Sequence, residues 1–451
     1  MLIGSLVYLF LRDAFVTMTA LCIGFSAIAV LMAVKLSGGS ARSVLVVATL
    51  TLSKAFVDYS TSGLENPLSH MLIALFFWVY LGRAALRWRT FFLGLITALT
   101  LTNRLDLGLI ILPAFLLHVV RHRSKQTCCH ALIGLVPFFA WMLFSLVYYG
   151  FFFPNTAAAK LNTGLDELAL WRQGGAYIHS TIRIDPLTSA TLLLGIVLPV
   201  WWMRSWKHSM LSVGVLLYLL YVVSFGGDFM TGRFFSVPFF ASALLLSRTV
   251  PRLPGWGVML TGLGIALLGV APARSPVRFQ ETLERLENHS KIEDERAFYM
   301  GCASLRALEE DRDIPDCVLA EKGREARRSG KRYAIKGSVG FYGYFAGPDI
   351  HIIDRFALTD PLLARLPMAR YENWRIGHFR RDIPEGYVQT VITGENRFKD
   401  KNLGVFYQRL ETVISGEIWS AERLFEILRF NTGQNDALLA ASLNPPSRSN
   451  I

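Results

Sequence analysis

Long apolar stretches, separated by short polar connections, fill the chain as far as residue 272 and most constrain what it can fold into. Hydrophobic residues make up 52% of the 451 residues, and the mean hydropathy is +0.38. A water-soluble domain is less apolar than this, so we expect a polytopic α-helical membrane protein. From residue 273 onward the sequence is charged and mixed, which predicts a separate soluble domain over 273–451.

About ten membrane spans are predicted from the apolar stretches of 15–272, with a short juxtamembrane segment, 1–14, before them. The expected starts are Phe15, Ser43, Pro67, Thr90, Leu107, Ala131, Pro186, Ser209, Phe234 and Trp256. The stretches 90–102 and 107–120 are too short to cross ~30 Å of hydrocarbon at about 1.5 Å per residue. We expect these two to be tilted, extended by their polar ends or buried in protein.

The basic residues predict the orientation of the bundle, because alternate connections hold basic side chains and no acidic ones. These side chains are Lys35, Arg42, Arg83, Arg87, Arg89, Arg121, Arg123, Lys125, Arg204, Lys207, Arg248 and Arg252. Without them, the 46 Lys and Arg fall to 34, which equals the 34 Asp and Glu. The positive-inside rule therefore accounts for the net charge of +12, and no excess is left to indicate a nucleic-acid partner. The other connections and the tail are expected on the outer side.

The octapeptide Gly226-Gly-Asp-Phe-Met-Thr-Gly-Arg233 lies between two apolar runs and is expected at the outer surface. Two glycines before Asp228 leave backbone room for a ligand, although Gly-Gly-Asp is also a common turn sequence. Arg104, Lys160 and Arg233 could hold phosphate oxygens. Alternatively, they extend to the interface or pair with nearby carboxylates.

Glu65 precedes Pro67 at the start of an expected span. Its carboxylate could take a proton from an acceptor hydroxyl or orient a sugar. Equally, it could be an acid at a helix N-terminus, stabilised by the helix dipole. The sequence leaves both interpretations open.

The tail is predicted to be a small α/β domain. Alternation in 339–345 and the run 350–353 predict two strands around a turn at 347–349. Helical patterns cover 277–311 and 411–431. Trp374, His378 and Tyr387 could contact an acceptor glycan, but aromatic side chains in a small domain are more often core.

No metal site is predicted. Cys128 and Cys129 lie near His122 and His130, but adjacent cysteines are poorly spaced for zinc. We therefore expect neither a metal nor a cofactor, with a divalent cation at the outer face as the open alternative.

Several motifs together resemble a known family. They are Ser62-Gly-Leu-Glu65, Leu101-Thr-Asn-Arg104, Pro154-Asn-Thr with Lys160, Gly226-Gly-Asp-Phe-Met, Gly232-Arg233, Ile353-Asp-Arg-Phe-Ala-Leu-Thr-Asp-Pro361, Trp374-Arg-Ile-Gly-His-Phe379 and Ile383-Pro-Glu-Gly-Tyr387. In these motifs the chain resembles bacterial relatives of the mycobacterial terminal arabinofuranosyltransferase, which are GT-C membrane glycosyltransferases. Some members are catalogued by a role in flagellar motor control.

The resemblance implies transfer of a sugar, with inversion, from a polyprenyl-phosphate donor to a glycan or glycolipid acceptor. The reaction would take place on the periplasmic side of the bacterial inner membrane, without a nucleotide sugar. By matching positions, the resemblance implies catalytic roles for Glu65 and Asp228. It also implies that Arg104, Lys160 and Arg233 bind the donor phosphate.

The family carries its principal acidic motif in the first outward loop, after the first span. Segment 1–14 resembles the helix just before the second span, so we expect a preceding span and loop to be missing here. A non-catalytic envelope, flagellar assembly or motor-control protein is therefore the alternative function. A transporter is disfavoured because ionisable residues gather at one surface and no pair of interrupted helices is evident.

Overall fold

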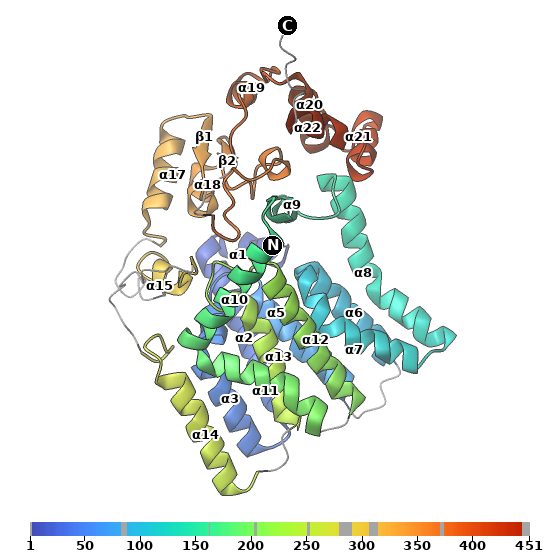
Figure 1. Ribbon diagram of the computed structural model, residues 1–451, viewed down its shortest axis with the longest axis vertical. Coiled ribbons are helices and arrows are strands. Elements are labelled where there is room, and N and C mark those ends of the chain that lie inside the picture. Colours follow the sequence, from blue (N-terminus) through green and yellow to red (C-terminus); the bar gives the residue numbers. More distant parts are fainter. Residues whose placement is uncertain are drawn as a thin grey trace. The chain divides into compact units, whose positions relative to one another are not determined.

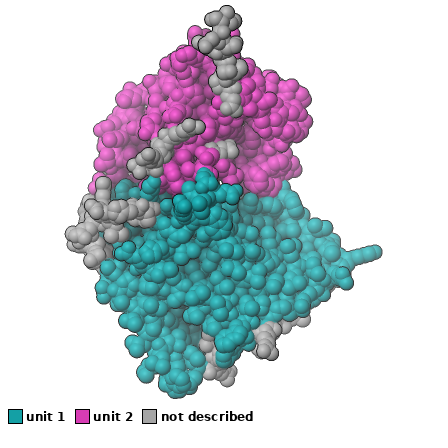
Figure 2. All heavy atoms as spheres, in the orientation of Figure 1, with its two compact units in different colours: residues 1–139, 166–304 teal, residues 140–165, 305–451 magenta. Residues whose placement is uncertain are grey.

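A computed structural model describes residues 2–82, 88–161, 163–202, 205–249, 253–278, 291–305, 314–369 and 374–443. The described chain is mostly helical (Figure 1). It divides into two compact units, shown in Figure 2: unit 1 comprises residues 1–139 and 166–304, and unit 2 comprises 140–165 and 305–451. These units are defined by packing, whereas the boundary predicted at residue 273 marks a change in composition.

The helices of unit 1 run in chain order as follows: α1 Leu2–Leu11, α2 Ala14–Ser37, α3 Ser40–Leu52, α4 Lys54–Ser60, α5 Asn66–Leu81, α6 Arg89–Asn103, η1 Leu105–Leu107, α7 Gly108–Arg121, α10 Glu167–Ile184, α11 Pro186–Trp202, α12 Trp206–Ser224, α13 Arg233–Thr249, α14 Gly255–Val270 and α15 Glu295–Tyr299. Helix α8, Lys125–Tyr149, contributes to both units. The structure describes the stretch 277–311, which is predicted to be helical, only in part, because 279–290 and 306–311 lie outside the described residues.

Three described helices, α2, α8 and α12, are long and apolar enough to cross a membrane. The number rises to five if each bent pair, α3 with α4 and α10 with α11, is one span. The chain is therefore a helical membrane protein, with three to five such spans shown in place of the ten expected. Helices α6 and α7 have 15 and 14 residues and bury Leu93 and Ile110, respectively.

Helix α13 lies at the centre of unit 1 and positions the site described below. All of its residues from 235 to 245 are buried, and it packs against α2, α3, α4, α5, α11 and α12. A helix that is apolar on every side is stable only when other elements surround it. Its first residue, Arg233, ends the octapeptide.

The two bent helix pairs meet at their bends, which measure 74° for α3–α4 and 114° for α10–α11. Asp185, at the second bend, accepts hydrogen bonds from the Ala55 amide at 2.8 Å and the Thr188 hydroxyl at 2.6 Å. The expectation that the chain has no pair of interrupted helices is therefore wrong. Residues 54–60 and 167–184 read as outer connections because they are polar, yet both form helices.

Unit 2 contains α9 Asn155–Leu161, α17 Val318–Arg328, β1 Tyr333–Lys336, α18 Gly340–Ala346, β2 His351–Asp354, η2 Leu363–Arg365, α19 Tyr387–Thr393, α20 Lys401–Ser415, α21 Ala421–Asn431 and α22 Asp436–Leu443. Strands β1 and β2 form a parallel pair in which Tyr333 lies opposite His351. This pair is the only sheet among the residues described. The expected helix over 411–431 is in fact parts of two helices, α20 and α21.

The strand predicted over 339–345 is wrong, because these residues lie almost entirely in helix α18. Parallel strands need a crossover, which is usually helical, and α18 supplies it between β1 and β2. Helix α17 packs closely on α18: a Cβ at Gly323 would lie 2.5 Å from the carbonyl oxygen of Tyr342. The strand predicted over 350–353 is confirmed by β2.

Candidate functional site

The octapeptide loop, residues 226–233, is held in one conformation by tyrosines from two helices. The Tyr59 hydroxyl donates to the Thr231 carbonyl, and that of Tyr177 donates to the Met230 carbonyl, both at 3.0 Å. Gly227 has a φ of +74°, and a Cβ there would lie 2.6 Å from the Tyr177 side chain. Only glycine fits both the backbone angle and the close approach.

A second segment, residues 291–296, lies along the loop, and we name it the strap. Its Glu293 amide donates to the Phe229 carbonyl at 2.7 Å, and the Thr231 amide donates to the Glu293 carbonyl at 2.9 Å. Asp294 of the strap pairs with Lys54 at 3.0 Å. Burial alone would raise the pKa of Asp294, but the Lys54 ammonium outweighs it and lowers the pKa. The strap thus fixes the loop to α4.

Lys54 and its neighbours extend this attachment. The ammonium also contacts Asp58 at 2.6 Å, and Asp58 pairs with Arg296 at 3.0 Å. Both members of the Lys54–Asp58 pair are almost fully buried. Breaking such a pair leaves an uncompensated buried charge, so these groups hold the strap firmly.

Beside the loop, Arg104 lies between α6 and η1 and is nearly fully buried. Its Nε donates to Asp106 Oδ1 at 3.1 Å and its Nη2 donates to the Tyr218 hydroxyl at 2.9 Å. The same hydroxyl donates to Asp106 Oδ2 at 3.0 Å. Two side chains therefore fix one edge of the guanidinium.

Glu65 connects this group to the octapeptide. One carboxylate oxygen, Oε1, lies 3.5 Å from Arg104 Nη1 and 3.1 Å from Arg233 Nη2. Arg233 Nη1 in turn lies 3.7 Å from Asp228 Oδ2. We name the five side chains Asp106, Arg104, Glu65, Arg233 and Asp228 the charge cluster. They come from the adjoining ends of α5, α6 and α13, from η1 and from the octapeptide loop.

The charges of the cluster reinforce one another. Burial opposes ionisation of Glu65, but the Arg233 and Arg104 guanidiniums outweigh it and hold the pKa of Glu65 below its usual value. The pKa of Asp106 is lowered in the same way, mainly by Arg104 against the effect of burial. Glu65 and Asp106 are therefore expected to be charged at neutral pH, beside the two guanidiniums.

The cluster nevertheless has unused hydrogen-bonding capacity. Within the described part of the chain, Arg104 Nη1 and Arg233 Nε are buried and make no hydrogen bond, although Nη1 lies 3.5 Å from Glu65 Oε1. A buried donor left in this state costs about 1–3 kcal/mol. The two arginines are therefore suited to receive acceptor oxygens from a ligand, and Glu65, with 27% of its side chain exposed, keeps the cluster reachable.

Each of these residues also has a structural alternative, which is ion pairing for the arginines and a position at a helix N-terminus for Glu65. The expected ion pairs of Arg104 and Arg233 with Asp106 and Asp228 are present. Glu65 does occupy the N-cap position of α5, but its side chain makes no capping hydrogen bond. It binds the two arginines instead.

The other predicted site residues lie in unit 2. Lys160 is exposed on α9 of unit 2, whereas the charge cluster belongs to unit 1. Trp374 and His378 are half-buried, and the His378 ring contacts Phe356 edge to face at 4.9 Å. Tyr387 is 1% exposed, and its hydroxyl donates to Asp360 at 3.0 Å. In this conformation Tyr387 has almost no surface to offer a ligand.

Sequence reasoning missed Tyr218 and the strap. Tyr218 lies in the apolar run of α12, where a tyrosine gives no signal that it differs from core. Asp294 follows an uninformative polar stretch. No group of three or more His, Cys, Asp or Glu that could hold a metal occurs among the residues described.

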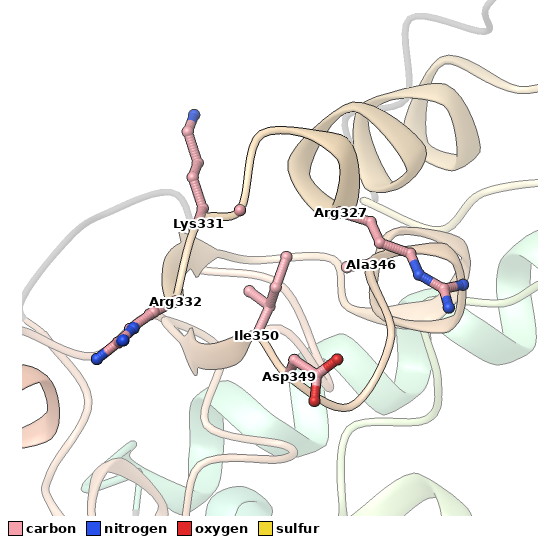
Figure 3. Close-up of a pocket in the computed structure, with 7 residues that line it drawn as sticks. Arg327, Lys331, Arg332, Ala346, Asp349 and Ile350 are labelled. Atoms are coloured by element: carbon pink, nitrogen blue, oxygen red, sulfur yellow. The ribbon is translucent and has the colours of Figure 1, made fainter.

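A hollow in unit 2 is lined by Arg327, Gly330, Lys331, Arg332, Ala346, Asp349 and Ile350. Figure 3 shows the charged ends of Arg327, Lys331 and Arg332 pointing in different directions. Because these three side chains do not converge on one point, the hollow does not gather its positive charges around a single ligand position.

Comparison with known proteins gives one partial relation. No family model matches the chain, and no solved structure matches it. A terminal β-(1→2)-arabinofuranosyltransferase from Corynebacterium glutamicum is 32% identical over 127 residues. The matched region covers 24% of this chain and only 18% of the length of that relative. Part of this helical membrane protein is thus similar to part of a glycosyltransferase.

Proposed function

We propose that the protein is a membrane glycosyltransferase that moves a sugar from a polyprenyl-phosphate donor to a hydroxyl of an envelope glycan. The observation that carries the proposal is the charge cluster, where two buried arginines keep donors without acceptors. Guanidinium groups bind phosphate oxygens through paired hydrogen bonds. The partial similarity to an arabinofuranosyltransferase supports the reaction class.

In this scheme Arg104 and Arg233 bind the donor phosphate and Glu65 is the general base. The acceptor hydroxyl gives its proton to the Glu65 carboxylate while its oxygen bonds to the anomeric carbon from the face opposite the phosphate. The bond from that carbon to the phosphate oxygen breaks, and its electron pair leaves on the phosphate. The two guanidiniums stabilise the charge that develops there. Asp228, buried beside Arg233, orients that arginine.

The proposal extends to the surroundings of the cluster. The bundle would be of GT-C type with about ten spans in the bacterial inner membrane, and the cluster and tail would face the periplasm. Support comes from the basic residues of the alternate connections. Lys160 would add a phosphate contact, and Trp374 and His378 would contact the acceptor.

The test is transfer of label from a set of radiolabelled polyprenyl-phosphate sugars into envelope glycan, with the arabinose donor tried first. Membranes that contain the protein should transfer label above membranes that lack it. Glu385→Gln, which changes an exposed carboxylate paired with Lys399, should transfer normally. Folded protein that transfers from no donor would contradict the proposal and favour the non-catalytic assembly role.

A further inference from the structure

Glu65 is the central side chain of the charge cluster. A single oxygen, Oε1, is shared by Arg104 and Arg233, at 3.5 and 3.1 Å. Each arginine also has a carboxylate of its own: Asp106 for Arg104 and Asp228 for Arg233. Glu65 is therefore the shared partner, and the only one of the three carboxylates that bridges both guanidiniums.

Glu65 is also the carboxylate that can most readily leave. Its side chain is 27% exposed, against 17% for Asp106 and 2% for Asp228. The side chain makes no capping hydrogen bond to α5. The backbone carbonyl of Glu65 accepts a hydrogen bond from the Asn103 side chain, and that bond does not involve the carboxylate. A rotation of the side chain would thus break its contacts with the two arginines without removing a cap from α5.

Charge balance decides whether a phosphate could enter without such a movement. The cluster has three carboxylates and two guanidiniums, and so already carries one excess negative charge. Two like charges about 4 Å apart repel by roughly 4 kcal/mol at an effective dielectric constant of about 20. A phosphate and an ionised Glu65 would therefore compete for the same two cations.

We propose that Glu65 occupies the donor-phosphate position in the ligand-free protein, and that a prenyl phosphate displaces it from between Arg104 and Arg233. This inference rests on the function proposed above and adds a condition to it. The phosphate takes over both arginine contacts, and the released carboxylate turns toward the acceptor.

Displacement couples donor binding to formation of the base. While the guanidiniums hold Glu65, they stabilise its charged form and make it a poor proton acceptor. Once the phosphate has captured both cations, the carboxylate beside it gains proton affinity, as a general base requires. The donor must then bind before the acceptor can be deprotonated.

The test measures binding of a short prenyl phosphodiester to the full chain in lipid nanodiscs. Its single charge does not titrate near neutral pH, and it needs no sugar or acceptor. Glu65→Gln removes the competing charge and keeps the shape, so its Kd should fall at least about tenfold. Glu385→Gln, an exposed carboxylate outside the cluster, should leave the Kd unchanged.

A pH titration gives a second readout that needs no change in folding. As the pH falls below the usual pKa range of a glutamate carboxyl, protonation of Glu65 removes the competitor, so the wild-type Kd should fall. The charged or titratable groups that face Glu65 are Arg104, Asp106, Arg233, Asp228 and the Cys22 thiol of α2. Because all of them remain in Glu65→Gln, that variant should lose the pH dependence only if Glu65 is its source.

The outcomes separate this inference from the proposed function. If the wild type binds the phosphodiester and Glu65→Gln binds it equally or more weakly, the donor site stands and displacement is wrong. If neither protein binds it at any pH, the donor site itself is wrong. If Glu65→Gln does not fold, a wild-type Kd that is constant or rises as the pH falls would overturn the displacement.

Discussion

Buried arginines serve different purposes in the two units. In unit 2, Arg423 is 1% exposed and donates to the carbonyls of Val147, Tyr148, Val413 and Ile418 at 2.8–3.2 Å. In unit 1, Arg104 and Arg233 bind side-chain carboxylates, and each keeps a nitrogen without an acceptor. Arg423 is satisfied by the fold alone, whereas the arginines of the charge cluster are not.

Arg381 follows the pattern of Arg423. It is 0% exposed, and its three nitrogens donate to the carbonyls of Leu366, Phe379 and Ala159. Backbone carbonyls cannot move independently of the fold, so such contacts attach 140–165 to the rest of unit 2. Carboxylate side chains can exchange with a ligand. The partner of a buried arginine thus indicates whether its role is structural or functional.

The largest expected effect on stability is in unit 2. Arg423→Met should lower the free energy of unfolding by about 3 kcal/mol or more, because four buried or part-buried carbonyls lose a donor. Urea denaturation of the full chain, monitored by the protease sensitivity of 305–443, measures this loss of stability. Unchanged stability would mean that Arg423 is not the structural arginine described here.

For Arg104 the expected loss is in transfer and not in folding. Arg104→Ala should abolish transfer, a loss of about 10³-fold or more, because it removes a donor to the developing phosphate charge. Arg104→Lys should keep the pairing with Asp106 and so the fold, yet still transfer poorly, because an ammonium cannot bind phosphate in a bidentate way. Normal transfer by either folded variant would remove Arg104 from the site.

An intermediate effect is expected for the strap. Asp294→Asn leaves the Lys54–Asp58 pair in place, but loosens the segment that lies along the octapeptide loop. Transfer should fall about tenfold, since small errors in the position of binding groups reduce rates. The measurement is the transfer rate beside that of Glu385→Gln; equal rates for the two variants would show that the strap does not position the loop.

The smallest expected effect on stability is at Tyr387, where it distinguishes a core residue from a ligand contact. Tyr387→Phe removes a hydrogen bond to the buried Asp360, so stability should fall by about 1–2 kcal/mol. Transfer by the remaining folded protein should stay normal. A rise in KM for acceptor without loss of stability would instead support the acceptor contact predicted from the sequence.

The chain's sequence predicts the charged positions better than the path of the backbone. Glu65, Arg104, Asp228 and Arg233 stand out because charges are costly beside apolar runs, and the structure brings all four together. Tyr218, which binds Arg104 and Asp106, does not stand out, since the tyrosine hydroxyl lies in an apolar helix. Its role depends on the packing of α12 against α7.

The helix bends show why the rest could not be predicted. Polar residues around Asp185 resemble a loop, but buried hydrogen bonds from Ala55 and Thr188 satisfy its carboxylate. Periodicity also fails over 339–345, where the pattern fits a strand but the parallel pairing of β1 and β2 requires a crossover helix. In both cases a contact distant in sequence outweighs the local pattern.

The central claim is that a lipid-linked phosphate binds between Arg104 and Arg233. The most direct measurement is an experimental structure of the full chain in a lipid nanodisc with polyprenyl phosphate bound. We predict phosphate oxygens within hydrogen-bonding distance of both guanidiniums and the Glu65 carboxylate turned away from them. A phosphate bound elsewhere, with Glu65 still between the two arginines, would contradict the account.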